Sequence, residues 1–145
     1  MTRLAHTRRR RSGERGQSLV EFSLAITIFL LLVMGTVDLG RAAYQYNGVA
    51  QAARELARVA SVHPGGTLGS STQVAAVLAT QRGLIPGLGT PTYTCLDIAG
   101  APVSGTCSGG NWVRVTINST FTPVTPMMAF LGVINLSSSA SARIE

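Results

Sequence analysis

Charged residues are scarce in this sequence, and none of the basic ones is lysine. Only 12% of the 145 residues are charged, whereas soluble domains usually carry roughly a quarter. A chain of this length forms one modest domain and is too short for two sizeable cores. The shortage of charge therefore indicates that part of the chain avoids water.

Most of the net positive charge lies in an N-terminal tail, which argues against a nucleic-acid partner. Residues 1–16 hold six arginines and one acid, a net of +5, while residues 17–145 hold six arginines and five acids, a net of +1. A nucleic-acid-binding domain usually keeps its charge as a patch or stripe on the fold. A basic tail beside an apolar segment suits membrane topology better.

Residues that commonly perform catalysis or bind metals are also few. The two histidines, His6 and His63, lie far in the sequence from the two cysteines, Cys95 and Cys107, so no metal site is expected. The chain has no G-x-S-x-G, no H-E-x-x-H and no phosphate-binding glycine loop followed by lysine. These absences indicate a protein that is not an enzyme and uses no cofactor.

The longest apolar run extends from Leu19 to Val37 and contains a single charged residue, Glu21. As a helix it is roughly 28 Å long, close to the hydrocarbon thickness of a bilayer. A buried core helix normally has a polar face, but here one serine and two threonines are the only interruptions after Glu21, and their hydroxyls can bond back to their own helix. The run predicts a transmembrane helix over residues 17–38.

Arginine counting gives the orientation of this span. Six arginines precede it within 16 residues, whereas the fifteen residues after Val37 contain only Arg41. The positive-inside rule makes residues 1–16 a basic cytoplasmic leader and places the chain beyond Asp38 outside. A secretory signal peptide has the same asymmetry, but its apolar core runs about 7–15 residues and ends in small residues. The sequence VDLGRAAY offers no convincing site of that kind, so this interpretation is the weaker one.

The outward orientation bears on Cys95 and Cys107, which both follow the span. An even number of cysteines in an extracytoplasmic domain favours a disulfide, and only one intramolecular pairing exists. We therefore expect a Cys95–Cys107 bond.

The sequence RGQSLVEF at the start of the span resembles the type IV prepilin pattern. If the chain is cut after Gly16, Gln17 becomes the N-terminus, Glu21 the fifth mature residue and Phe22 the sixth. A basic leader, a cleavage-site glycine and a glutamate at the fifth position of a hydrophobic helix make up that pattern. The freed α-ammonium and the Glu21 carboxylate can neutralise each other, most usefully between packed subunits. The alternative is that Glu21 lies shallow enough to reach the lipid headgroups.

The resemblance extends beyond this motif. Residues 15–61 are similar to the TadE-like family throughout, including the Asp38–Arg41 pair, Tyr44 and the stretch Ala52–Arg58. The resemblance implies a pseudopilin or minor pilin of the tight-adherence (type IVb-like) pilus apparatus. Its implied partners are the lipid bilayer, a prepilin peptidase and other pilin or pseudopilin subunits.

For individual residues the resemblance implies a limited set of roles. Gly16 and Gln17 flank the processing site, and Glu21 and Phe22 match assembly positions. Gln17 departs from the phenylalanine that begins many type IV pilins, so N-methylation of the new terminus does not follow. The family has no catalytic residues to transfer.

Beyond the span the pattern predicts an α+β, pilin-like fold. The helix should continue outside the membrane over residues 39–63, with an alanine-rich stripe on one side, and end at Pro64–Gly66. This stripe can pack on the protein's own domain or on another subunit. Residues assigned to the opposite, polar side are Arg41, Gln45, Gln51, Glu55 and Arg58.

Residues 64–145 should form a small extracytoplasmic α+β domain. We expect a short helix over Thr72–Arg82 and a strand over Thr92–Ile98. Apolar and polar residues alternate over Asn111–Phe121 and Val133–Glu145, which predicts two half-buried antiparallel strands. The sheet should therefore have one apolar face covered by helix and one polar face in water.

Residues 122–133, TPVTPMMAFLGV, connect the last two strands. Their prolines exclude a regular strand. The apolar segment Met127–Leu131 has two interpretations: it docks on the bilayer surface or a partner, or it is a connection tucked onto the sheet.

Together these features predict a single-pass protein of the cell membrane that acts in assembly of a tight-adherence pilus. The alternative is an uncleaved, single-pass anchored extracytoplasmic module for binding or adhesion. Gly16 separates the two, because an assembly subunit loses its leader and an anchored module keeps it.

Overall fold

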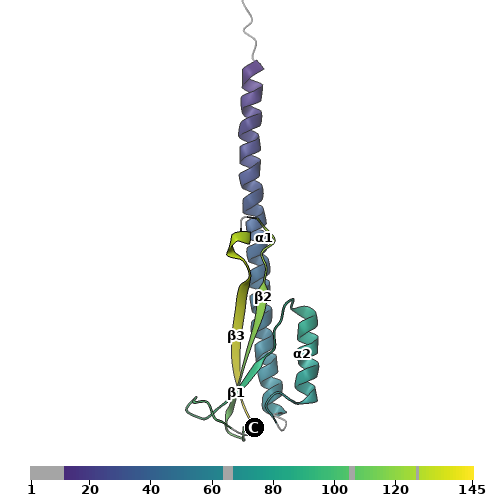
Figure 1. Cartoon of the computed structure of the whole chain (residues 1–145), viewed down its shortest axis with the longest axis vertical. Helices are drawn as coiled ribbons and strands as arrows, with labels where there is room; N and C mark the ends of the chain where they lie inside the picture. The colour runs from purple at the N-terminus through teal and green to yellow at the C-terminus, as the bar shows by residue number, and fades with distance from the viewer. Residues whose placement is uncertain (1–11, 64–66, 105–106, 127) are drawn as a thin grey trace, which may run out of the picture.

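The computed structural model describes residues 12–63, 67–104, 107–126 and 128–145, with side chains from Gly16 onward. A long helix, α1 (Ser12–Val62), is followed by α2 (Thr72–Leu84), β1 (Thr92–Leu96), β2 (Trp112–Phe121), a 3-10 turn η1 (Ala129–Leu131) and β3 (Ile134–Arg143). The small sheet and α2 pack around the second half of α1, while the first half stands alone (Figure 1). The expected α+β architecture is confirmed.

Helix α1 is continuous for 51 residues, about 75 Å at the usual rise. No proline interrupts residues 12–62, and Pro64 follows the end of the helix, where it cannot continue it. The described part of the helix begins at Ser12, five residues before Gln17, where we expected the start. The added turn contains Gly13 and Gly16, which have low helix propensity, beside Glu14 and Arg15, which have high propensity.

The three strands form one antiparallel sheet in the order β1–β2–β3. Trp112 pairs with Leu96 on one side and with Arg143 on the other, while Phe121 at the opposite end of β2 pairs with Ile134. Every second residue of β2 is buried, so the predicted alternation is confirmed. β1 ends at Leu96, two residues early, because a turn follows in which the Asp97 carboxylate accepts a hydrogen bond from the Ala101 amide and the Asp97 amide donates to the Ala101 carbonyl.

The core lies between the sheet and one face of α1. The sheet contributes Val113, Val115 and Ile117, each at most 1% exposed. The helix contributes mainly small residues, which let the backbones approach closely. Fully buried positions of α1 are Val49, Ala52, Ala53, Leu56, Ala57 and Ala60. The alanine-rich stripe therefore packs on the protein's own sheet, which decides between the two interpretations of it for this part of α1.

Helix α2 packs beside α1 and completes the domain (Figure 1). It begins at the side chain of Ser71, which accepts a hydrogen bond from the Val74 amide as an N-cap. It ends at Leu84, two residues beyond the expected Arg82. Ile85, after its end, is buried against Gly48 of α1, where an added Cβ would lie 3.2 Å from the Ile85 side chain.

The close approach of helix and sheet gives a first prediction. Ala53→Leu inserts three carbons where the side chain is 0% exposed, and overpacking of this kind costs about 1–3 kcal/mol. Chemical unfolding of the full chain in detergent micelles should show the loss as an earlier midpoint. Ala43→Leu, on an exposed part of the same helix, is the matched control and should change stability by less than about 0.5 kcal/mol. Equal midpoints for the two variants would contradict this packing.

Candidate anchoring and assembly site

The first half of α1 exposes apolar side chains on all sides. Its most apolar 18-residue window has a mean hydropathy of 2.2 and is 0% buried within the structure. Leu19, Phe22 and Leu24 are each more than 60% exposed. The helix is thus long and apolar enough to cross a membrane, and none of this window is buried by the described residues.

Polar groups within this stretch are satisfied by the helix itself, as expected. Ser23 donates to the Val20 carbonyl at 2.8 Å, Thr27 to the Ser23 carbonyl at 2.7 Å, and Thr36 to the Leu32 carbonyl at 2.9 Å. Such bonds remove the cost of placing a hydroxyl in an apolar medium. Glu21, the one acidic residue between residues 16 and 37, is a different case.

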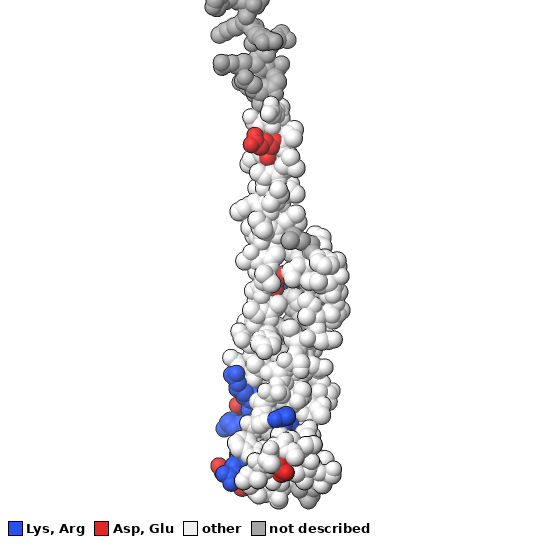
Figure 2. Space-filling model, turned by 90° about the vertical axis from the view of Figure 1, so that its left-hand side faces the viewer, with Lys and Arg blue, Asp and Glu red and all other residues white. Residues whose placement is uncertain are grey.

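Glu21 is exposed, and the structure pairs it with no basic side chain among the described residues. Figure 2 shows acidic atoms on the otherwise uncharged upper helix, far from the arginines that gather at the other end of the domain. An unpaired carboxylate in an apolar environment is costly. In an apolar environment the Glu21 carboxylate would therefore require a cation or water as its partner.

The sequence-predicted processing and assembly residues lie together at the start of this stretch. Gly16, Gln17 and Phe22 are all exposed, and nothing lies within 4 Å of a Cβ built on Gly16. Gln17 and Glu21 are four residues apart and so lie on the same side of the helix. The Gly16–Gln17 bond is accessible, but it lies inside the first turns of α1.

Asp38, directly after the apolar run, connects the helix to the β2–β3 connection. Its carboxylate is 1% exposed and accepts hydrogen bonds from the Thr125 hydroxyl at 2.7 Å, the Thr125 amide at 2.9 Å and the Val124 amide at 3.1 Å. Arg41 completes the set at 2.9 Å. We expected only the Arg41 pair, which would contribute little on an exposed helix. The contact with residues 124 and 125 was missed.

The sequence pattern predicts Gln45 on the polar side of α1, and this prediction is wrong. Its side chain is 9% exposed, and its amide nitrogen lies 2.8 Å from the Pro86 carbonyl and 3.0 Å from the Thr120 carbonyl. The buried hydroxyl of Ser119 also contacts it and donates to Pro86. A buried polar side chain needs such partners, and here they join α1, β2 and the loop after α2.

Two open grooves flank α1 near Asp38. One, of about 670 Å³, lies between Tyr44, Leu84 and Thr122; the other, of about 430 Å³, lies between Val33, Val37 and Val124. The charged residues that line them are Asp38 and Arg41, which pair with each other. Within the described residues no group of three or more potential metal ligands occurs. These grooves offer surfaces for contact and hold no pair of acids for proton transfer.

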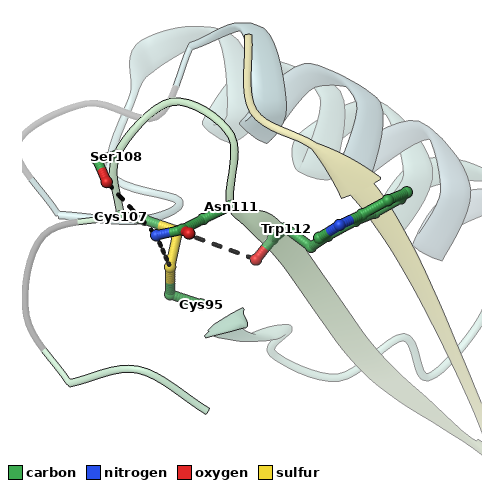
Figure 3. The surroundings of a disulfide bond; sticks show 5 residues. All are labelled: Cys95, Cys107, Ser108, Asn111 and Trp112. Atoms are coloured by element: carbon green, nitrogen blue, oxygen red, sulfur yellow. Dashed lines mark hydrogen bonds between the residues drawn. A yellow bond between two sulfur atoms is a disulfide. The ribbon is translucent and has the colours of Figure 1, made fainter. Parts of the chain in front are cut away.

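Cys95 and Cys107 meet at the end of the domain remote from the apolar helix. Their Cα atoms are 5.7 Å apart, inside the range of disulfides. Asn111 extends over the pair, with its amide nitrogen 3.8 Å from the Cys95 sulfur and 3.4 Å from the Ser108 hydroxyl (Figure 3). The bond ties the end of β1, which contains Cys95, to the β1–β2 loop, which contains Cys107.

Comparison with known proteins supports the resemblance noted in the sequence. Residues 16–58 match a family model described as TadE-like protein. This segment is the part of α1 that begins at Gly16 and includes Glu21, Asp38 and Gln45. No curated protein and no solved structure matches the chain. The TadE-like relationship is therefore confirmed over α1, and the sheet lies outside the matched segment.

The cysteine pair gives a second prediction. Alkylation without reductant should leave Cys95 and Cys107 unmodified in protein from its native envelope, and both should react after reduction and unfolding. Replacing both by alanine should lower the free energy of unfolding by about 2–4 kcal/mol, because the closed loop no longer restricts the unfolded chain. Free thiols in the native protein, measured by mass spectrometry, would refute the bond.

Proposed function

We propose that this chain is a membrane-anchored pseudopilin or minor pilin that takes part in assembly of a tight-adherence, type IVb-like pilus. Residues 17–38 cross the cytoplasmic membrane, the basic residues 1–16 lie in the cytoplasm, and the domain formed by residues 39–145 lies outside. The observation that carries this proposal is the uncovered apolar half of α1 with its single carboxylate, which forms no ion pair among the described residues. The family match over the same helix supports it.

The orientation follows from charge on either side of the apolar stretch. The leader holds six arginines, and cytoplasmic flanks of membrane spans are enriched in such residues. On the other side, Arg41 is held against Asp38 and lies 5.5 Å from the centre of the Phe121 ring. A paired arginine packed on an aromatic ring gives little signal for retention in the cytoplasm.

Glu21 is the residue through which we expect subunits to recognise one another. After cleavage, the α-ammonium of Gln17 lies one helical turn, about 6 Å along the axis, before Glu21. A neighbouring helix displaced by that turn brings its ammonium level with this carboxylate. The attraction between the charges is far stronger in an apolar medium than in water, and an unpaired charge there is penalised. The pair therefore sets the register between subunits as well as holding them together.

Cleavage also requires the first turns of α1 to open. A protease binds its substrate in an extended form, whereas the Gly16–Gln17 bond lies within the helix. Each glycine costs a helix about 1 kcal/mol relative to alanine, and Gly13 and Gly16 both fall in this region. The sequence thus weakens the helix at the bond that the peptidase must reach.

The third prediction concerns this bond. In a host with the matching prepilin peptidase, the mature chain should begin QSLVEF, as read by mass spectrometry of its N-terminal peptide. Gly16→Lys should block processing because a long charged side chain replaces the glycine, whereas Gly13→Lys, three residues upstream, should be processed. A chain that starts at Met1 would favour the uncleaved anchored module, and a start after Ala43 would favour a signal peptide.

The fourth prediction concerns Glu21. Glu21→Ala should insert into the membrane at least as well as the parent chain, because a charged group has gone, and it should still lose its leader. It should fail to co-purify with partner pilins and should abolish or strongly reduce piliation in a complementation assay.

Glu55→Gln is the matched control, since it removes an acid from the same helix outside the membrane. Glu55 forms an exposed pair with Arg58 at 2.9 Å, and Arg58 lowers the pKa of Glu55, but such pairs contribute little. Normal piliation by a cleaved, well-expressed Glu21→Ala chain would show that Glu21 merely reaches the headgroups.

A further inference from the structure

The β2–β3 connection, residues 122–133, lies at the end of the domain nearest the apolar half of α1 (Figure 1). Hydrogen bonds from Val124 and Thr125 to Asp38 hold it there. The groove beside this contact is lined by Val33, Met34 and Val37 from the helix and by residues 124–126 from the connection. Val33 and Val37 belong to the last turn of the apolar run, so the connection lies at the level where the helix would leave the bilayer.

The connection directs apolar side chains away from the protein. Val124 is 74% exposed, Phe130 81% and Val133 60%. Met127 lies outside the described residues, so the part of the predicted segment that the structure shows is Met128–Leu131. Of the two interpretations of this segment, tucking onto the sheet does not describe it, because η1 leaves Phe130 and Leu131 uncovered.

The backbone of the connection is suited to a medium poor in water. The amides of Met128 and Ala129 donate to the Thr125 carbonyl, the Leu131 amide donates to the Met128 carbonyl and the Gly132 amide to the Ala129 carbonyl. Pro123 and Pro126 have no amide hydrogen to satisfy. Gly132 then turns the chain into β3 with a φ of +65°, a conformation that glycine adopts readily. Non-helical backbone near lipid requires internal satisfaction of this kind.

Among the described residues, the charged side chains at this end of the domain are Asp38, which is buried, and Arg41, which is half-exposed and pairs with Asp38. Residues 115–142 contain no charged residue, and the arginines gather at the opposite end (Figure 2). A charged group would oppose entry into the interface. An exposed apolar segment without charge, continuous with an apolar helix, has the chemistry of a surface that meets lipid.

We propose that residues 122–133 rest on the outer surface of the bilayer, with Val124 and Phe130 reaching the boundary between headgroups and acyl chains. This inference rests on the membrane span in the proposed function. Because the span already holds the domain at the membrane, docking is intramolecular and a small apolar contact is sufficient. The Asp38 contact fixes the height of the connection, so α1 and the connection together orient the domain on the membrane.

Site-specific tryptophan fluorescence tests this proposal in the full chain. Trp112→Phe removes the native tryptophan, and Phe130→Trp or Ile98→Trp then places a single reporter. Ile98 is 84% exposed and follows the end of β1 that pairs with Trp112, so it reports from the remote end. Each chain is reconstituted into phosphatidylcholine vesicles with bromine attached near the headgroup end of the acyl chain or near its tip.

The reporter at position 130 should emit at shorter wavelength than that at 98 and should be quenched several-fold more, most strongly by bromine near the headgroups. Water-like emission and equal quenching at both positions, in chains that float with the vesicles, would overturn the docking and leave the span intact. Chains that do not float with the vesicles would overturn the span as well, since the docking depends on it.

Discussion

One uninterrupted helix has to serve two environments, and the other elements are arranged around that constraint. From Leu19 to Val37 apolar side chains lie on every side of the helix and none is buried by the described residues, whereas from Val49 to Ala60 one face is fully buried under the sheet. The helix needs no break between these parts because their difference lies in the side chains. Alanines in the second part let the sheet approach closely, and large apolar residues in the first part leave an uncovered apolar surface, which faces lipid under the proposed function.

The change from one environment to the other occurs over residues 38–45, where polar contacts join the helix to the domain. The Asp38 carboxylate accepts hydrogen bonds from the amides of residues 124 and 125. About two helical turns later, the Gln45 side chain donates to the carbonyls of Pro86 and Thr120. Both side chains are buried, so loss of either would leave unsatisfied partners. Because these contacts tie distant loops to fixed points on α1, they determine how the domain is oriented relative to the apolar half of the helix.

The sequence revealed the features that depend on local pattern. The apolar run, the alternation in β2 and β3 and the position of α2 each follow from periodicity within about ten to twenty residues. The contacts of Asp38 and Gln45 could not be read in this way, because their partners lie 86 and 41 residues away. Gln45 was misplaced for a related reason: a polar residue next to a buried stripe is assigned to water unless its partners are known. A glutamine with apolar residues one helical turn before and after it, as Gln45 has in Ala42 and Val49, is the sequence signal that could have indicated a buried side chain.

The proposed membrane-anchored function requires above all that lipid surrounds the first half of α1. Spin labels attached singly at residues 26, 27, 28 and 29 sample every side of the helix, because successive residues are about 100° apart. With the Cys95–Cys107 bond kept oxidised in a chain reconstituted into vesicles, power saturation measures collisions of each label with oxygen and with a water-soluble nickel complex. The account predicts that all four labels meet oxygen and are shielded from nickel, while a label at the exposed Asn47 meets nickel freely. Accessibility that rises and falls with the helical period, with nickel reaching one side, would contradict it.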